Sequence, residues 1–309
     1  MDLALEPYDD NVSSSWLICS TCGTQFPTAD RSALRTCHVC DDPRQYVPPS
    51  GQSFTTMADI RASGHRNEMK PYEHDERVIS IHTEPRFAIG QRAILIRTPE
   101  GNILWDCITL LDDETVDKIK QLGGLKAIVI SHPHFYSTHI QWARAFQCPV
   151  YVSAEDVRWT TTPSAHRKPI TDVESEIVPG VQAIKLGGHF PGSMVLLFDG
   201  RLFIADTLMT TPAGIGKWEV DALGQKREKP PGLNSFSFQW SFPNNIPLSA
   251  DEIHRMWGIL KAYSFRSTHG ILVGMDIEDD EVKARVLESM KIQTRAMGNV
   301  THALLDETL

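Results

Sequence analysis

The sequence predicts an α/β fold preceded by a small module that contains four cysteines. Two observations carry this prediction. Strands and amphipathic helices alternate from about residue 78 onward, and two Cys-x-x-Cys pairs lie within the first 40 residues. The chain has 309 residues, enough for one large domain with a small appendage. We therefore expect three parts: the module over residues 1–50, a polar connector over 51–77 and the main domain over 78–309.

The composition narrows the class of partner. With 41% hydrophobic and 22% charged residues, the chain has the composition of an ordinary globular protein. The net charge of -9 argues against a long nucleic-acid interface, because phosphate backbones bind clustered Lys and Arg. The sequence shows neither a signal-peptide pattern nor an apolar run long enough to span a bilayer, which predicts a cytoplasmic protein with no membrane partner. A small-molecule substrate fits better.

The four cysteines of the module, Cys19, Cys22, Cys37 and Cys40, are expected to bind one structural zinc ion as a zinc ribbon. Thiols stay reduced in a chain without a secretory signal, and two close pairs supply four thiolates to one tetrahedral ion. So short a segment cannot fold on its own core, and zinc contributes about 10–16 kcal/mol in small zinc peptides. The module has few basic residues, so we expect a docking or dimerising role, with a homo-oligomer as one outcome.

In the main domain, residues 93–98 and 103–105 read as a hairpin, and Asp112 or Asp113 caps a helix after it. An apolar strand over 126–130 then runs into a pair of histidines. Further strands are expected over 149–152, 181–186, 194–198 and 201–205, and helices over 139–146, after Ser249 and around Val282–Met290.

Residues with metal-binding side chains stand where these strands end. His132 and His134 follow the buried strand and are placed to point toward one ion. His189 lies in a glycine-rich turn between two strands, Asp206 ends the strand over 201–205, and His269 precedes a glycine. A single histidine or aspartate after a strand is more often structural. Only the ordered set indicates a metal site.

Three motifs carry a family resemblance: HPH at 132–134, GGHFPGS at 187–193 and IADT at 204–207. In this order they resemble the metal site of the metallo-β-lactamase superfamily, over roughly residues 78 to 275. The resemblance implies a four-layer αβ/βα sandwich, with metals held at one edge between its two sheets.

The resemblance also implies ligand roles. His132, His134 and His189 would form a three-histidine site, Asp206 would bridge or border two metals, and His269 would bind the second metal.

The sequence departs from the family pattern after the first two histidines, where Tyr136 and Ser137 replace the usual Asp-His pair. Two usual ligands of the second metal are therefore missing, which favours a mononuclear or unequal zinc site. His139 is either a substitute ligand or a residue that caps or solvates its helix. Tyr136 either donates a hydrogen bond to an oxyanion or packs over the place of the missing metal.

We therefore expect a zinc-dependent hydrolase of a small carbonyl compound, such as a lactone, lactam, cyclic carbamate or ester. Three histidines with an open position lower the pKa of zinc-bound water to about 7. Asp206 and Tyr136 are the expected catalytic residues. The aromatic-rich segment 207–248 is expected to be a lid that sets specificity, unless its aromatics only pack on the sheet.

Two alternatives remain open at this point. The first is a mono-iron site of His132, His189 and Asp206, with chemistry like that of the persulfide-oxidising relatives in the superfamily. The second is a non-catalytic zinc-binding interaction protein, in which the cysteine module is the active part.

Overall fold

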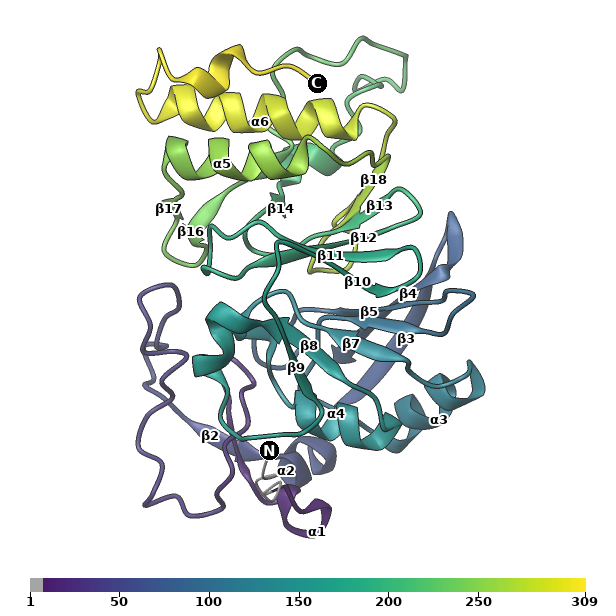
Figure 1. The fold of residues 1–309 in the computed structure, drawn as a ribbon, viewed down its shortest axis with the longest axis vertical. Coiled ribbons are helices and arrows are strands. Elements are labelled where there is room, and N and C mark those ends of the chain that lie inside the picture. Colours follow the sequence, from purple (N-terminus) through teal and green to yellow (C-terminus); the bar gives the residue numbers. More distant parts are fainter. Residues whose placement is uncertain (1–7) are drawn as a thin grey trace.

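The computed structural model describes residues 8–309, which form a sandwich of four layers. From bottom to top in Figure 1, the layers are α3 with α4, a seven-stranded sheet, a six-stranded sheet, and α5 with α6. The predicted α/β class and the αβ/βα layering are both confirmed.

The seven-stranded sheet is built in simple sequence order, β3-β4-β5-β6-β7-β8-β9, antiparallel at first and parallel from β6 onward. The predicted hairpin is its β5–β6 pair. Its strands are β3 (Arg66–Tyr72), β4 (Asp75–Glu84), β5 (Ala93–Ile96), β6 (Ile103–Trp105), β7 (Ala127–Val129), β8 (Val150–Ser153) and β9 (Arg167–Ile170).

The six-stranded sheet has the order β10-β11-β12-β13-β18-β19, with one parallel pair, β13 and β18. The β12–β13 turn at Asp199 and Gly200 has two positive φ angles, as a two-residue hairpin turn requires. Its strands are β10 (Glu174–Val178), β11 (Val181–Lys185), β12 (Met194–Phe198), β13 (Arg201–Phe203), β18 (Ser267–His269) and β19 (Asp276–Glu278).

Helices cover the outer face of each sheet. On the first sheet lie α3 (Asp113–Gln121), capped by Asp112, and α4 (His139–Phe146). On the second lie α5 (Ala250–Leu260), whose N-cap Ser249 accepts from the backbone N–H of Glu252, and α6 (Val282–Ala296). Each layer interface therefore has an apolar core of its own.

The core between the two sheets contains Trp105 and Val129 from the first sheet and Leu196 and Phe203 from the second, all almost fully buried. Each large apolar side chain removed from water contributes on the order of 1.5–3 kcal/mol to folding. This core fixes the relative position of the two sheets at the edge where both end. It therefore also holds the loops that leave that edge in place.

The N-terminal part is packed onto the main domain. Strand β1 (Leu17–Cys19) pairs with β2 (Phe54–Thr56), and α2 (Met57–Ala62) follows, so the pairing crosses the expected boundary at residue 50. Strand β3 also belongs to the seven-stranded sheet, although we expected residues 51–77 to be a connector. The polar residues of β3 make this strand hard to recognise from the sequence, because β3 lies at the edge of the sheet and has one face exposed to solvent. A short helix, α1 (Asp10–Ser13), precedes β1.

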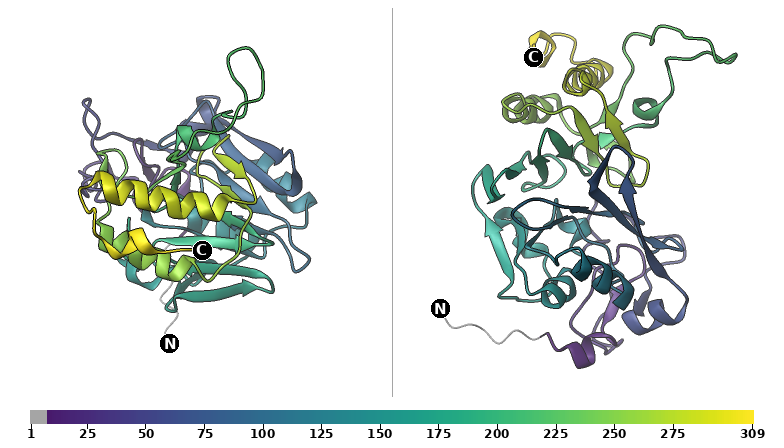
Figure 2. Two further views of the ribbon diagram at one scale, coloured as in Figure 1. Left: turned by 90° about the horizontal axis from the view of Figure 1, so that it is seen from above. Right: turned by 90° about the vertical axis from the view of Figure 1, so that its right-hand side faces the viewer.

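The segment 207–248 is only partly a lid. Phe236 and Phe238 are fully buried against α5 and α6, as the packing alternative proposed, whereas Phe242 is exposed. Part of the segment projects as a loop from the helical end of the molecule (Figure 2). It contains the short strands β14 (Met209–Thr210), β15 (Phe236–Ser237), β16 (Gln239–Ser241) and β17 (Ile246–Pro247).

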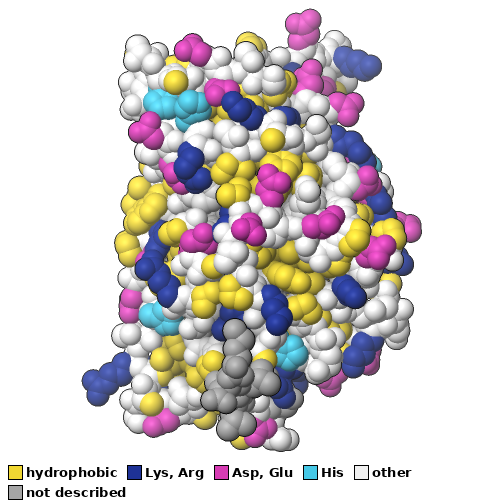
Figure 3. Space-filling model, in the orientation of Figure 1, with side chains coloured by type: hydrophobic (Ala, Val, Ile, Leu, Met, Phe, Trp, Pro, Cys, Tyr) yellow, Lys and Arg dark blue, Asp and Glu magenta, His cyan; other side chains and the backbone are white. Residues whose placement is uncertain are grey.

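The short 3-10 turns are η1 (Pro133–Phe135), η2 (Ala154–Trp159), η3 (Pro212–Ile215) and η4 (Ala303–Asp306). On the face shown in Figure 3, acidic and basic side chains are interspersed, with no block of one sign. Among residues 8–309, no helix is both long enough and apolar enough to cross a bilayer.

Candidate metal centre

The four expected ligands His132, His134, His189 and Asp206 converge on one point at the edge where the sheets end. His132 follows β7 and His134 lies in the η1 turn, while His189 comes from the β11–β12 loop and Asp206 from the loop after β13. All four are buried. Ligands that lie far apart in sequence are thus brought together by strand ends of both sheets.

The spacing of the four ligand atoms fits a tetrahedral ion. The Oδ2 atom of Asp206 lies 3.5 Å from His132 Nε2, 3.8 Å from His134 Nδ1 and 3.6 Å from His189 Nε2. The nitrogens of His134 and His189 are 3.1 Å apart. Tetrahedral zinc with bonds of about 2.0–2.1 Å would place its ligand atoms roughly 3.3–3.4 Å apart. The observed distances bracket that value.

The protonation of the cluster also suits a metal. Burial lowers the pKa of His134 to about 4 and that of His189 well below its ordinary value, so both rings are neutral, the form that binds metals. Burial alone would raise the pKa of Asp206, but the neighbouring histidines hold it well below its ordinary value. His132 Nε2 is buried without a hydrogen-bond partner among the described residues. A bound cation would satisfy it.

Two contacts behind the ligands fix their orientation. The Nδ1 atom of His189 bonds the carbonyl of Trp240 at 2.8 Å, which leaves Nε2 free for the metal. His132 Nδ1 bonds the hydroxyl of Ser131 at 2.8 Å. Gly188 permits the turn before His189, because it has a φ of +83° and a Cβ there would lie 2.5 Å from the hydroxyl of Thr207.

Comparison with known proteins agrees with this fold. No model of a known protein family matches the chain. The chain is 39% identical over 257 residues to YmaE, an uncharacterized protein of Bacillus subtilis (strain 168), and the match covers 81% of this chain and 86% of YmaE. Among solved structures, VMB-1 at pH 5.5 matches with a TM-score of 0.51 and 13% identity, over 74% of this chain and 99% of VMB-1.

The DIM-1 metallo-β-lactamase matches with a TM-score of 0.50 and 12% identity, over 75% of this chain and 98% of DIM-1. The chain belongs to the family of YmaE and has the metallo-β-lactamase fold. At identities this low, the likeness to VMB-1 and DIM-1 shows the fold alone. The four ligands of this metallo-β-lactamase-fold protein therefore rest on its own geometry.

The four cysteines form a second cluster that fits a metal, and this one is closed. Cys19 Sγ lies 3.6 Å from Cys40 Sγ, and Cys22 Sγ lies 3.6 Å from Cys37 Sγ. Tetrahedral zinc with sulfur bonds of about 2.3 Å would place its sulfurs roughly 3.8 Å apart. All four side chains are buried, and Trp159 of the main domain packs against them. Closed tetrahedral thiolate sites of this kind are structural.

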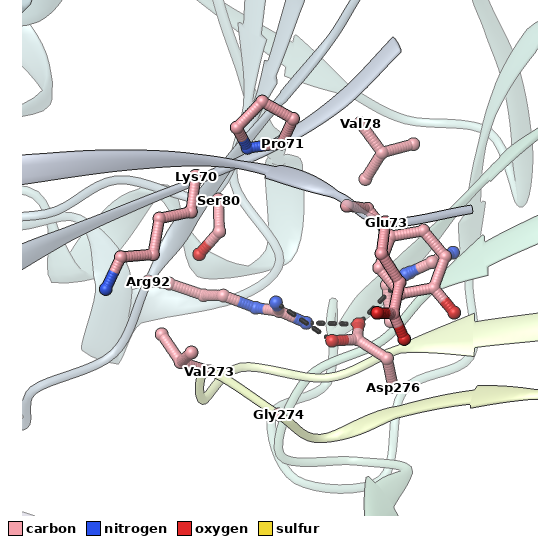
Figure 4. Close-up of a pocket in the computed structure, with 11 residues that line it drawn as sticks. Lys70, Pro71, Glu73, Val78, Ser80, Arg92, Val273, Gly274 and Asp276 are labelled. Carbon is pink, nitrogen blue, oxygen red and sulfur yellow. Dashed lines mark hydrogen bonds and ion pairs between the residues drawn. The ribbon is translucent and has the colours of Figure 1, made fainter. Parts of the chain in front are cut away.

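The structure corrects the assignment of His269 as a metal ligand. Its Nδ1 atom is 2.9 Å from Asp276 Oδ1, its Nε2 atom is 3.3 Å from the hydroxyl of Ser267, and its ring stacks on Phe203. The residue lines a different pocket of 290 Å³, where Arg92 pairs with Asp276 (Figure 4). The register of β18 places the ring here, with both of its nitrogens already bonded.

His139 and Tyr136 also lie outside the ligand cluster. His139 Nδ1 bonds the carbonyl of Tyr136 at 2.7 Å, and Nε2 lies 3.3 Å from a nitrogen of Arg167. Burial and the Arg167 guanidinium lower the pKa of His139 to about 3. The hydroxyl of Tyr136 donates to the carbonyl of Asp156 at 3.3 Å. His139 is thus a core residue and the Tyr136 hydroxyl is bonded to the backbone, so neither expected role is supported.

A cavity of about 180 Å³ opens beside the metal cluster, and Asp206 is the one ligand that lines it. Its walls are mainly apolar, with Gln45, Tyr46 and Arg86 as the polar members. The lining residues are Gln45, Tyr46, Arg86, Ile89, Asp206, Met209, Phe242, Pro243, Ile271 and Leu272. The volume is below the 300–1,000 Å³ typical of drug-sized ligands. The site therefore suits a small molecule.

Sequence reasoning missed two residues that shape the site. Asp106 ends β6 and accepts a hydrogen bond from the backbone of Ser131 at 2.7 Å, which anchors the loop that carries His132. Burial raises its pKa to about 7. An acid directly after an apolar strand could have revealed it. Arg44 of the cysteine module donates to the carbonyl of His189 at 3.3 Å, a contact that no local pattern signals.

Proposed function

We propose that this protein is a zinc-dependent hydrolase of small carbonyl compounds, with one catalytic zinc held by His132, His134, His189 and Asp206. A single observation carries the proposal: the ligand atoms of three histidines and one aspartate converge beside a cavity that Asp206 lines, where an ion could take a water as a further ligand. When bound there, zinc polarises a carbonyl oxygen and lowers the pKa of a water to about 7. The missing Asp-His pair and the placement of His269 support one catalytic zinc rather than two.

The side chains of the protein have three tasks in this reaction. The neutral histidines hold the ion without neutralising its charge. Asp206 uses Oδ2 toward the ligand cluster, while its buried Oδ1 has no partner among the described residues. This oxygen is placed to orient the attacking water and to accept its proton. The proton then passes to the leaving alcohol or amine as the carbon–oxygen or carbon–nitrogen bond breaks.

The apolar walls favour small substrates and exclude bulk water. Met209, Phe242, Ile271 and Leu272 give the cavity an apolar surface around the carboxylate. A lactone, a lactam, a cyclic carbamate and an aryl ester all present a reactive carbonyl within a small apolar body, so they form the substrate panel to test. Tyr136 has no part in the proposal, since its hydroxyl is bonded elsewhere.

The test measures hydrolysis of one member of each class by zinc-loaded protein, beside Asp206→Asn and a His132→Ala, His134→Ala double variant. We expect hydrolysis of at least one class, with rates about 10²–10³-fold lower in Asp206→Asn, the range seen when one transition-state contact is removed. Equal rates in the double variant would reveal a contaminating esterase. If zinc occupies the site and no class is hydrolysed, the proposal is wrong. Iron in the purified site would redirect it toward oxygen chemistry.

A further inference from the structure

The cysteine module supplies one wall of the cavity beside the metal centre. Gln45 and Tyr46, which follow Cys40 closely in sequence, line the cavity together with Asp206. Gln45 is 7% exposed and so firmly placed, whereas Tyr46 is 48% exposed and offers half of its surface to the cavity and solvent. The module therefore borders the same cavity as one of the candidate metal ligands.

The wall is clamped to the segment that carries Phe242 and Pro243. The hydroxyl of Ser241 donates to the carbonyl of Arg44 at 3.1 Å. The amide of Asn244 donates to the carbonyls of Pro43 at 3.1 Å and Gln45 at 3.0 Å. Three consecutive backbone carbonyls of the module are thus bonded by side chains 197 to 201 positions further along the chain. Such a clamp fixes the position of the wall.

Arg44 ties the wall to the metal ligands. Its guanidinium pairs with Asp42 at 2.7 Å, lies 3.9 Å from the ring centre of Phe190 and donates to the carbonyl of His189. Trp240, next to Ser241, bonds the other end of His189 through its carbonyl. The residues at both ends of the clamp therefore touch the same ligand. The chain of contacts runs from the four-cysteine cluster to the metal centre.

We propose that residues 43–46 form a substrate-binding wall, held by the four-cysteine cluster at one end and by the clamp of Ser241 and Asn244 along its length. Tyr46 and Gln45 are then specificity-determining residues, which contact the part of the substrate beyond its reacting carbonyl. The aromatic ring of Tyr46 faces a cavity with Phe242 and Ile271, so the wall selects a ring-bearing acyl group. This inference rests on the proposed hydrolase function.

The test uses two metal-chelating probes that differ by one ring, acetohydroxamate and benzohydroxamate. Their binding to zinc-loaded, full-length protein is measured by isothermal titration calorimetry, so no hydrolysis is needed. Tyr46→Ala is compared with Val47→Ala, which truncates the next exposed side chain but does not line the cavity. A second variant, Asn244→Ala, removes two of the three hydrogen bonds of the clamp and leaves the residues that line the cavity unchanged. Zinc content is verified for every variant.

We expect Tyr46→Ala to weaken benzohydroxamate binding about tenfold, equivalent to about 1.4 kcal/mol, while acetohydroxamate binding stays within about twofold. Asn244→Ala should weaken benzohydroxamate in the same direction by about threefold, and Val47→Ala should change neither probe. If both probes bind and Tyr46→Ala leaves benzohydroxamate binding unchanged, the proposal of a substrate-binding wall is wrong, while the proposal of an open metal centre is unaffected. If neither probe binds wild-type protein with zinc in place, the hydrolase proposal itself fails, and the wall with it.

Discussion

The two ligand clusters of this protein differ in what surrounds them. The four cysteines are packed among apolar side chains, which include Phe26, Val39 and Trp159. The three histidines and Asp206 stand beside an open cavity, and a carboxylate oxygen there lacks a partner. A closed cluster can only hold the chain together, whereas an open one leaves a place for a substrate. The difference supports a structural role for the first cluster and the proposed chemistry at the second.

Loss of the cysteine cluster should have the largest effect. In a Cys37→Ser, Cys40→Ser variant the N-terminal part loses its metal, and we expect a destabilisation of more than about 4 kcal/mol. The wall at residues 43–46 should loosen with it, because its anchor at Cys40 is gone. Urea unfolding and limited proteolysis measure these effects. A variant that is as stable as wild type and equally resistant to protease would contradict the structural role of the cysteine cluster.

Loss of the histidine cluster should affect chemistry rather than folding. We expect His132→Ala, His134→Ala to lose hydrolysis by at least about 10³-fold, because the metal ligands are removed. Its melting temperature should stay within about 4 °C of that of wild-type protein when both proteins are treated with a chelator. Thermal unfolding followed by circular dichroism provides the measurement. A collapse of the fold would mean that this cluster, too, is structural.

A third prediction concerns His139, a buried histidine that belongs to neither cluster. His139 has a pKa of about 3 in the folded protein, below the usual 6.5 of an unfolded chain, because of burial and Arg167. Between these values the unfolded chain binds the extra proton, so His139 costs the fold stability as the pH falls below 6.5. The substitution His139→Asn keeps a hydrogen-bond donor for the Tyr136 carbonyl and removes this pH-dependent loss of folding stability.

The variant and wild type are compared by urea unfolding after chelator treatment of both. From pH 7 to 5.5, wild type should lose about 1 kcal/mol more stability than His139→Asn. Identical pH slopes for the two proteins would show that His139 is not held neutral.

The smallest effect is expected at Tyr136. Tyr136→Phe removes a hydroxyl whose bond to the Asp156 carbonyl is 3.3 Å long, so the loss of stability should be about 0.5–1.5 kcal/mol. Hydrolysis rates should stay within about twofold of wild type in the same assay. A tenfold loss would return Tyr136 to the catalytic site.

Local signals predicted most of the strands and helices and placed four of the expected ligands at strand ends, whereas the four layers followed from the family resemblance. The end of a strand is indicated by an apolar run that stops at polar residues. This pattern identified His132, His134 and Asp206 as candidates. The capping residues Asp112 and Ser249 predicted the starts of α3 and α5 for the same reason. Each of these features is encoded by a few neighbouring residues in the sequence.

Direction and long-range contact were not predictable in this way. His269 ends a strand, as residues of the histidine and aspartate cluster do, but its direction depends on the register of β18 between β13 and β19. The hydroxyl of Tyr136 bonds the backbone carbonyl of Asp156, 20 positions further along the chain, which no local pattern predicts. The clamp between Asn244 and the cysteine module joins segments that no local pattern connects.

The most direct test of the two-cluster account counts the metals. Elemental analysis of purified wild-type protein should give about two zinc ions per chain, one for each tetrahedral cluster. The His132→Ala, His134→Ala variant should keep one, and Cys37→Ser, Cys40→Ser should lose the other. A single zinc in both wild type and the histidine variant would contradict the account, because the open cluster would then hold no metal.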